Sequence, residues 1–180
     1  YTEIVEPRTF KGNLRQEIQI QTGMKNTRLV ATVGHDSAAA VAAIPDFGEN
    51  KLYISIGTNV SMGVERSECL LSREGYLKGF KNIDRKKIIY RDFSACWHLN
   101  EFIRTRKEQG ITYSFVDLIN MALEVKNPVP WFDVEVLSFN EAGGDFCRKM
   151  NQYFAQTGQR ELTEDGEFVR SIYESIVLKI

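Results

Sequence analysis

Apolar residues in the second half of the chain recur at the spacing of amphipathic helices. The pattern predicts four helices: over 92–107, from 114 onward, from 145 to a close at Gly158, and over 165–180. Ser114 and Asp117 have the spacing of a capping box, and Asp145 is a suitable N-cap for the third helix. The helix after Ser114 has one apolar face, formed by Phe115, Leu118, Ile119, Ala122 and Leu123.

Short β-branched runs and glycine turns characterise the first half of the chain. Residues 28–34 predict a strand buried on both faces, which leads into an alanine-rich helix at 38–44 with Asp36 or Ser37 as its N-cap. Residues 51–56 and 60–65 flank a glycine-containing turn and predict a β-hairpin. This order of elements indicates an α/β fold, with Asp36 at the carboxyl end of a strand.

Two further segments give weaker patterns. Residues 1–28 are polar and broken by Pro7, Gly12 and Gly23, so we expect an extended leading segment with a short strand and turn rather than a core helix. Residues 75–83 fit either a strand or a surface loop.

The composition is that of an average globular domain, with 43% apolar and 26% charged residues among 180. Lys and Arg number 23 against 24 Asp and Glu, so the chain has no excess charge to attract nucleic acid or an anionic membrane. Three cysteines without metal-type spacing favour a reducing compartment, and no apolar run reaches 18 residues. We therefore expect a cytoplasmic protein with neither nucleic acid nor a membrane as partner.

The two ends of the chain indicate a piece of a longer protein. The first residue is Tyr1 rather than Met, and the last predicted helix is still apolar at Ile180. A natural terminus usually ends in polar sequence.

His35 and Asp36 are the only adjacent histidine and aspartate. They could bind a metal ion, but the one other histidine, His98, lies beside Trp97 and Leu99 in a helix that we expect to be packed, so we predict no metal site in the chain. No Gly-x-Ser-x-Gly elbow is present to supply a nucleophile. The carboxylate of Asp36 could accept a proton from a bound hydroxyl group, or it could only cap its helix.

The sequence offers two possible phosphate contacts. Gly57 and Thr58 combine backbone amides with a hydroxyl group, which suits phosphate oxygens, although Gly-Thr turns are also ordinary in hairpins. The basic stretch from Lys81 to Arg91 is read as a solvated loop. No Walker loop is present.

Several short motifs, in this order along the chain, resemble the FGGY carbohydrate kinases, in particular the rhamnulokinase and L-fuculokinase branch. They are His-Asp-Ser-Ala at 35–38, Gly-Thr at 57–58, Gly-Val-Glu at 63–65, Lys-Asn-Ile at 81–83 and Asp-Gly-Glu-Phe-Val-Arg at 165–170. The opening segments at 3–7 and 12–14 also resemble the part that precedes the second lobe of these kinases.

The resemblance implies an actin-like, ribonuclease-H-like ATPase lobe, with a mixed sheet flanked by helices. Residues 28–180 would be part of the C-terminal lobe, and residues 1–27 would link it to a first lobe of the same chain. Members of the family transfer the γ-phosphoryl group of ATP, with Mg²⁺, to a sugar hydroxyl group in the cleft between the two lobes. The resemblance therefore implies a sugar kinase for a rhamnulose-like or fuculose-like ketose, inactive as this chain alone.

The same resemblance implies roles for six residues. Asp36 matches the catalytic base, Gly57 and Thr58 match the turn that binds the ATP phosphates, and Asn100 stands near the position of a glutamine that contacts ATP. The sugar contacts would be His35 and Asn82.

The chain also departs from the family pattern. Asn59-Val60 replaces a Trp-Ser pair, and about ten additional residues separate Asn82 from the helix with Trp97. A non-catalytic actin-like module that binds a sugar or regulates a partner is therefore a second reading, and a metal phosphohydrolase based on His35 and Asp36 is a third.

Overall fold

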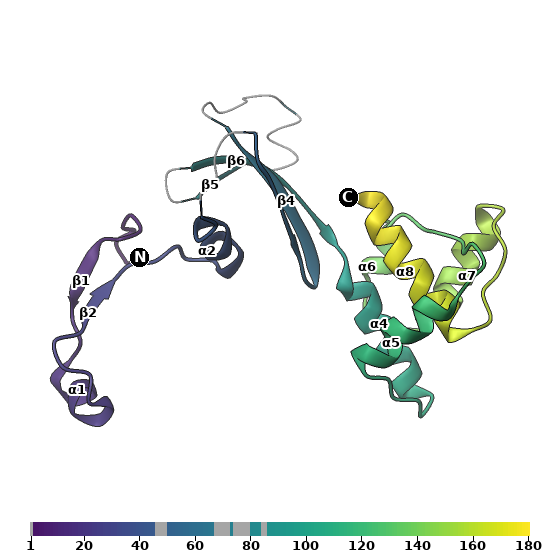
Figure 1. The fold of residues 1–180 in the computed structure, drawn as a ribbon, viewed down its shortest axis with the longest axis horizontal. Helices are drawn as coiled ribbons and strands as arrows, with labels where there is room; N and C mark the ends of the chain where they lie inside the picture. Colours follow the sequence, from purple (N-terminus) through teal and green to yellow (C-terminus); the bar gives the residue numbers. More distant parts are fainter. Residues whose placement is uncertain (1, 46–49, 67–72, 74–79, 84–85) are drawn as a thin grey trace. The chain divides into compact units, whose positions relative to one another are not determined.

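The computed structural model describes residues 2–45, 50–66, 73, 80–83 and 86–180, with residues 80–83, 86 and 87 described by their backbone alone. The chain divides into two compact units (Figure 1). The first unit contains residues 1–54 and 62–91, and the second contains residues 55–61 and 92–180. The described part is mixed α/β, with small antiparallel sheets and helices, in agreement with the predicted α/β class.

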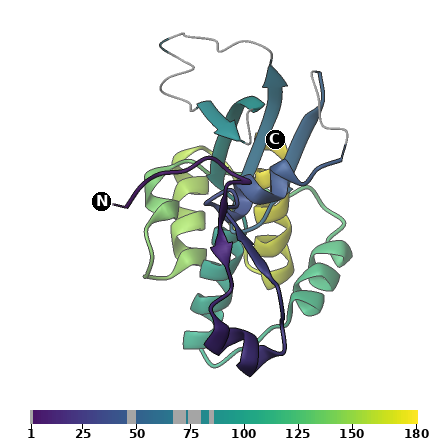
Figure 2. The same ribbon diagram turned by 90° about the vertical axis from the view of Figure 1, so that its left-hand side faces the viewer.

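The first unit begins with a two-stranded antiparallel ribbon. Strand β1 (Phe10–Asn13) pairs with β2 (Arg28–Val30), and helix α1 (Gln16–Thr22) connects them at one end of the ribbon (Figure 2). No residue of α1 is buried, so the segment lacks a core helix as predicted, but the helix itself departs from the expected extended segment. The prediction of a strand buried on both faces is wrong, because every residue of β2 is exposed in this ribbon.

Helix α2 (Asp36–Ala42) packs on a four-stranded sheet in the order β3-β4-β6-β5. The strands are β3 (Leu52–Ile56), β4 (Asn59–Arg66), β5 (Phe80–Ile83) and β6 (Lys86–Ser94). Val41 of α2, Tyr53 of β3 and Ile88 of β6 form the buried core of this unit. Burial of these apolar side chains fixes α2, and with it Asp36, on one face of the sheet.

The sheet confirms one prediction and corrects another. Strands β3 and β4 form the predicted hairpin, with Gly57 and Thr58 as its two-residue turn. The stretch from Lys81 to Arg91 is a pair of antiparallel strands rather than a solvated loop, with Phe80 opposite Ile89. Within the ambiguous segment 75–83, residues 80–83 are a strand, and residues 75–79 lie outside the described residues.

Gly63 in β4 occupies a position where even a methyl group has no space. A Cβ atom there would lie 2.7 Å from Tyr53 Cε1 and 2.8 Å from the Ile89 carbonyl oxygen. We expect Gly63→Ala to lower the free energy of unfolding by about 1–3 kcal/mol, because the sheet backbone must move. Urea unfolding of Gly57→Ala provides the control, since its Cβ would meet nothing closer than the Asn59 carbonyl oxygen at 3.8 Å. Equal losses in the two variants would contradict this prediction.

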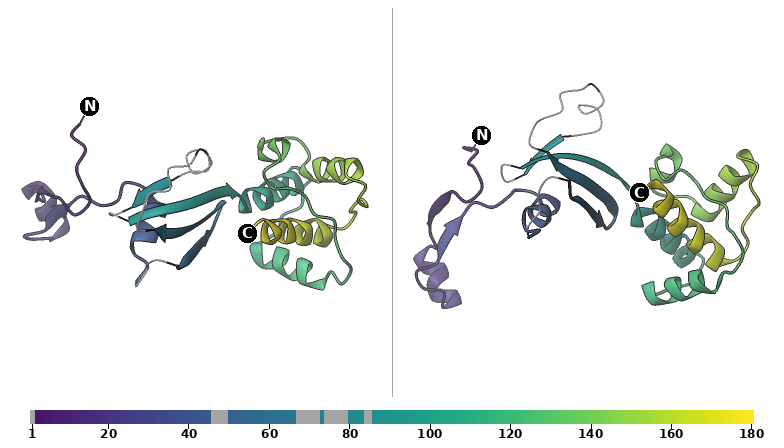
Figure 3. Two further views of the ribbon diagram at one scale, coloured as in Figure 1. Left: turned by 90° about the horizontal axis from the view of Figure 1, so that it is seen from above. Right: turned by 45° about the horizontal axis from the view of Figure 1, so that its top comes forward.

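The second unit is a cluster of helices (Figure 3). They are α4 (Cys96–Glu108), α5 (Phe115–Glu124), α6 (Leu137–Asn140), α7 (Phe146–Gln156) and α8 (Asp165–Lys179). The capping box of Ser114 with Asp117 is present, and Asp145 accepts a hydrogen bond from the Arg148 N–H, so both predicted caps are confirmed. Helix α4 begins later than predicted, because residues 92–94 still belong to β6.

An aromatic cluster fills the core between α4, α6 and α7. Phe132, Phe139 and Phe146 are at most 1% exposed, and their rings surround His98 of α4, which is fully buried. The prediction that His98 belongs to a packed helix is therefore confirmed. Within the ranges described above, every helix is too short or too polar to span a lipid bilayer.

Candidate functional site

Asp36 is the first residue of α2. His35 precedes it as the N-cap, in an extended conformation and without a side-chain capping bond. The expectation that Asp36 or Ser37 caps the helix is therefore wrong. So is the expectation that Asp36 follows a strand directly, because β2 ends at Val30 and residues 31–35 form an irregular connection. The last backbone bonds of this ribbon join Ala31 to Thr9 (2.8 Å) and Arg8 (2.7 Å), so the pairing ends well before Asp36.

The carboxylate of Asp36 is held by its immediate neighbours and is open to solvent. Asp36 Oδ1 accepts hydrogen bonds from the Ser37 backbone N–H (2.7 Å) and the Ser37 hydroxyl group (3.3 Å), and it lies 3.2 Å from His35 Nδ1. The side chain is 96% exposed. The Ser37 amide, followed by the charge of His35 and the Ser37 hydroxyl group, lowers the pKa of Asp36 below its usual value. Asp36 is therefore ionised at neutral pH and accessible to a ligand.

The turn of Gly57 and Thr58 in the second unit lies against the start of α4. The Thr58 carbonyl oxygen accepts from the backbone N–H groups of Ala95 (3.0 Å) and Trp97 (3.1 Å), and the Gly57 carbonyl oxygen accepts from Cys96 (3.2 Å). These bonds satisfy backbone donors that a helix start otherwise leaves without partners. The turn and the helix thus form one hydrogen-bonded unit.

The same bonds determine which groups of the turn remain for a ligand. The Gly57 N–H donates to the Asn59 carbonyl oxygen at 2.9 Å. The Thr58 side chain is exposed, and within the described part of the chain its hydroxyl group has no hydrogen-bond partner. The Thr58 hydroxyl group is thus a donor that this turn can offer to phosphate oxygens, whereas the Gly57 amide is already bonded.

Asn100 lies one helical turn after Trp97 in α4, on the same side of the helix, and is exposed. The structure thus places Gly57, Thr58 and Asn100 around one helix start. His35 and Asp36 are adjacent at the start of α2 in the other unit. The backbone of Asn82 pairs with Lys87 in the β5–β6 hairpin, and its side chain lies outside the described residues.

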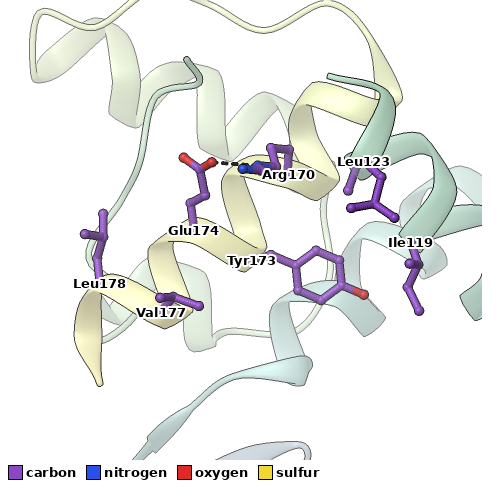
Figure 4. A pocket seen from close by; sticks show the side chains of 8 residues that line it. Ile119, Leu123, Arg170, Tyr173, Glu174, Val177 and Leu178 are labelled. Atoms are coloured by element: carbon purple, nitrogen blue, oxygen red, sulfur yellow. Dashed lines mark hydrogen bonds and ion pairs between the residues drawn. The ribbon is translucent and has the colours of Figure 1, made fainter. Parts of the chain in front are cut away.

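An apolar groove between α5 and α8 was not predicted from the sequence. Its volume is about 610 Å³, and Figure 4 shows Tyr173 from α8 extending toward Ile119 and Leu123 from α5, with Val177 further along α8. The predicted apolar stripe of α5 is real, but only Leu118 and Ala122 from it are buried. The remainder lines the groove or faces solvent, because α8 covers half of the stripe.

The described residues provide no metal centre of protein ligands alone. Among them, no three His, Cys, Asp or Glu side chains gather closely enough to hold an ion. Cys96 and Cys147 are free thiols, and burial raises the pKa of Cys147 to about 12. A buried thiol with so high a pKa is a poor nucleophile and a poor metal ligand.

Curated proteins align with nearly the entire chain. A rhamnulokinase of Enterococcus faecalis is 26% identical over 183 residues, which cover 99% of this chain and 36% of the relative. A rhamnulokinase of Bacteroides thetaiotaomicron is 29% identical over 93% of this chain and 34% of the relative. The chain is similar to rhamnulokinases over nearly its full length. This similarity confirms the resemblance inferred from the motifs.

The matched rhamnulokinases are much longer than this chain. A third example, from Oceanobacillus iheyensis, is 31% identical over 68% of this chain and 26% of its own length. Some curated rhamnulokinases align with 99% of this chain, and the chain spans about a third of their length. No protein-family profile matches the chain.

Proposed function

We propose that the complete gene product containing this chain transfers a phosphoryl group from ATP to a hydroxyl group of a rhamnulose-like or fuculose-like ketose. The similarity to rhamnulokinases supports a sugar kinase. The observation that carries the proposal is the exposed, ionised carboxylate of Asp36, which stands within the His-Asp-Ser-Ala motif at the start of α2. A carboxylate in this state can orient a sugar hydroxyl group and accept its proton as the phosphoryl group is transferred.

The other residues of the site would bind and orient the two substrates. The Thr58 hydroxyl group would donate to ATP phosphate oxygens, and the bonds from α4 to the Gly57 and Thr58 carbonyl oxygens would fix the turn in place. Asn100 would contact the nucleotide one helical turn further along α4. His35, 3.1 Å from the Ser37 hydroxyl group, and Asn82 would contact the sugar.

Mg²⁺ would arrive together with ATP. Phosphate oxygens commonly supply a large part of its coordination. The ion would neutralise charge on the phosphoryl group during transfer. Among the residues of this chain, Thr58 and its turn would then bind the ATP phosphates.

We also propose where this chain lies in the fold of the complete gene product. Residues 28–180 would be part of the C-terminal actin-like, ribonuclease-H-like ATPase lobe, and residues 1–27 would link it to a first lobe that completes the cleft. The matched rhamnulokinases are about three times as long as the chain, which supports this division. Among the described residues, the free thiols of Cys96 and Cys147 support a cytoplasmic location.

A panel of ketoses and deoxy-ketoses with Mg-ATP tests the proposed activity. We expect the complete gene product to form ADP and a sugar phosphate with rhamnulose or fuculose, and the 180-residue chain alone to form neither. Reactions without sugar control for ATP hydrolysis. Sugar binding without ADP formation would favour the non-catalytic module, and hydrolysis of a sugar phosphate with a bound metal would favour the phosphohydrolase.

A further inference from the structure

The Gly57–Thr58 turn is tied to the aromatic core through a single residue of α4. The backbone N–H of Trp97 donates to the Thr58 carbonyl oxygen at 3.1 Å. The indole Nε1–H of the same residue donates to the Phe139 carbonyl oxygen in α6 at 3.2 Å. Trp97 therefore bonds the turn with its backbone and the core with its side chain.

The far end of this connection is rigid. Phe139 is 1% exposed, and its ring packs against Phe132 at 4.5 Å and Phe146 at 5.9 Å between ring centroids. Close packing of this kind allows little movement. The Phe139 carbonyl oxygen is thus a fixed point from which the indole can position the first turn of α4.

The positions of the Gly57–Thr58 turn and of Asn100 depend on the start of α4. The described bonds that hold the turn to α4 come from Ala95, Cys96 and Trp97, and among these three only Trp97 also hydrogen-bonds the core with its side chain. Asn100 follows Trp97 by one helical turn, so a shift of the helix start would displace the turn and Asn100 together.

We propose that Trp97 is a positioning residue for ATP binding, which holds the Thr58 hydroxyl group and Asn100 in place through its bond to the Phe139 carbonyl oxygen. This inference rests on the proposed role of the Gly57–Thr58 turn in binding ATP. Trp97 itself needs no contact with the nucleotide. Its loss would weaken ATP binding more than it slows the transfer of the phosphoryl group.

The substitution Trp97→Phe tests this role, because it removes the indole N–H and keeps an aromatic ring. The matched control is Trp131→Phe, at the other tryptophan of these 180 residues, which is 54% exposed. Hydrogen–deuterium exchange of the complete gene product follows the peptides that contain residues 56–60 and 95–101. We expect exchange there to rise about fivefold in Trp97→Phe, as the loss of one hydrogen bond implies, and to be unchanged in Trp131→Phe.

Kinase assays then connect the exchange to function. We expect the KM for ATP to rise about fivefold in Trp97→Phe, with kcat changed less than twofold and the KM for the sugar unchanged.

The outcomes separate this inference from the proposed function. Unchanged exchange in Trp97→Phe would overturn the anchoring role whether or not the protein is a kinase. Increased exchange with an unchanged KM for ATP would overturn the link between the turn and ATP. Absence of kinase activity in the wild type would contradict the proposed function, and the exchange comparison would still decide whether Trp97 anchors the turn.

Discussion

Replacing Asp36 with asparagine is expected to reduce kcat of the complete gene product by about 10²–10⁴-fold, the usual contribution of a general base. The amide cannot accept the proton of the sugar hydroxyl group, although its oxygen can still accept the bond from the Ser37 N–H. Stability should not change, because the carboxylate is almost fully exposed and its bonds join it only to adjacent residues. Steady-state kinetics with the preferred ketose and Mg-ATP, together with thermal unfolding, measure both effects.

Asp145→Asn is the matched control for this experiment. Asp145 is also an exposed aspartate at a helix start, where it accepts from the Arg148 N–H at 3.0 Å, and asparagine is an equally good N-cap. We expect its kcat to remain within twofold of the wild type. If Asp36→Asn turned over the sugar as fast as the wild type, Asp36 would not be the base, and its carboxylate would have only a local role in the helix start.

Local signals in the sequence located helices α5, α7 and α8 of the second unit well, whereas the short helix α6 was not predicted. The capping box of Ser114 with Asp117 and the cap at Asp145 are bonds between residues three positions apart, so the sequence alone contains both partners. The start of α4 was misplaced because Phe93 fits both a helix and a strand pattern. Its pairing in β6 depends on residues elsewhere in the sheet.

Burial was harder to predict than secondary structure. Residues 28–30 form a strand as expected, yet they are exposed, because burial depends on what covers a strand and not on its composition. The same holds for α5, where α8 covers Leu118 and Ala122 and leaves Ile119 and Leu123 at an open groove.

The candidate site was predicted in its parts but not in its connections. The sequence located the turn at 57–58 within its hairpin, whereas the local structure predicted for Asp36 was wrong. The bonds from Ala95 and Trp97 to Thr58 join residues almost forty positions apart. The bond from the Trp97 indole to Phe139 spans 42 positions. No local pattern encodes such pairs, so the structure was needed to show that α4 holds the turn.

Acid is expected to destabilise the second unit through His98. Burial lowers the pKa of His98 from 6.5 to about 4, while the carbonyl groups of Val134, Phe139 and Ser94 oppose this shift without hydrogen bonding to either ring nitrogen. Above pH 6.5 the ring is neutral in both the folded and the unfolded chain. As the pH falls from 6.5 to 4, only the unfolded chain takes up the proton, so folding loses roughly 3 kcal/mol of stability from this residue.

Urea unfolding at pH 7 and pH 4 measures this loss in the wild type and in His98→Phe, which keeps a flat ring among Phe132, Phe139 and Phe146. We expect the loss to be smaller in the variant by roughly 3 kcal/mol, whatever its stability at pH 7, because phenylalanine binds no proton in either state. His35→Phe is the control, since it removes the only other histidine, whose side chain is 71% exposed. We expect this variant to keep the loss of roughly 3 kcal/mol that comes from His98. The same loss in His98→Phe would mean that the buried ring takes up its proton as readily in the folded chain as in the unfolded one, which its fully buried position among three phenylalanines opposes.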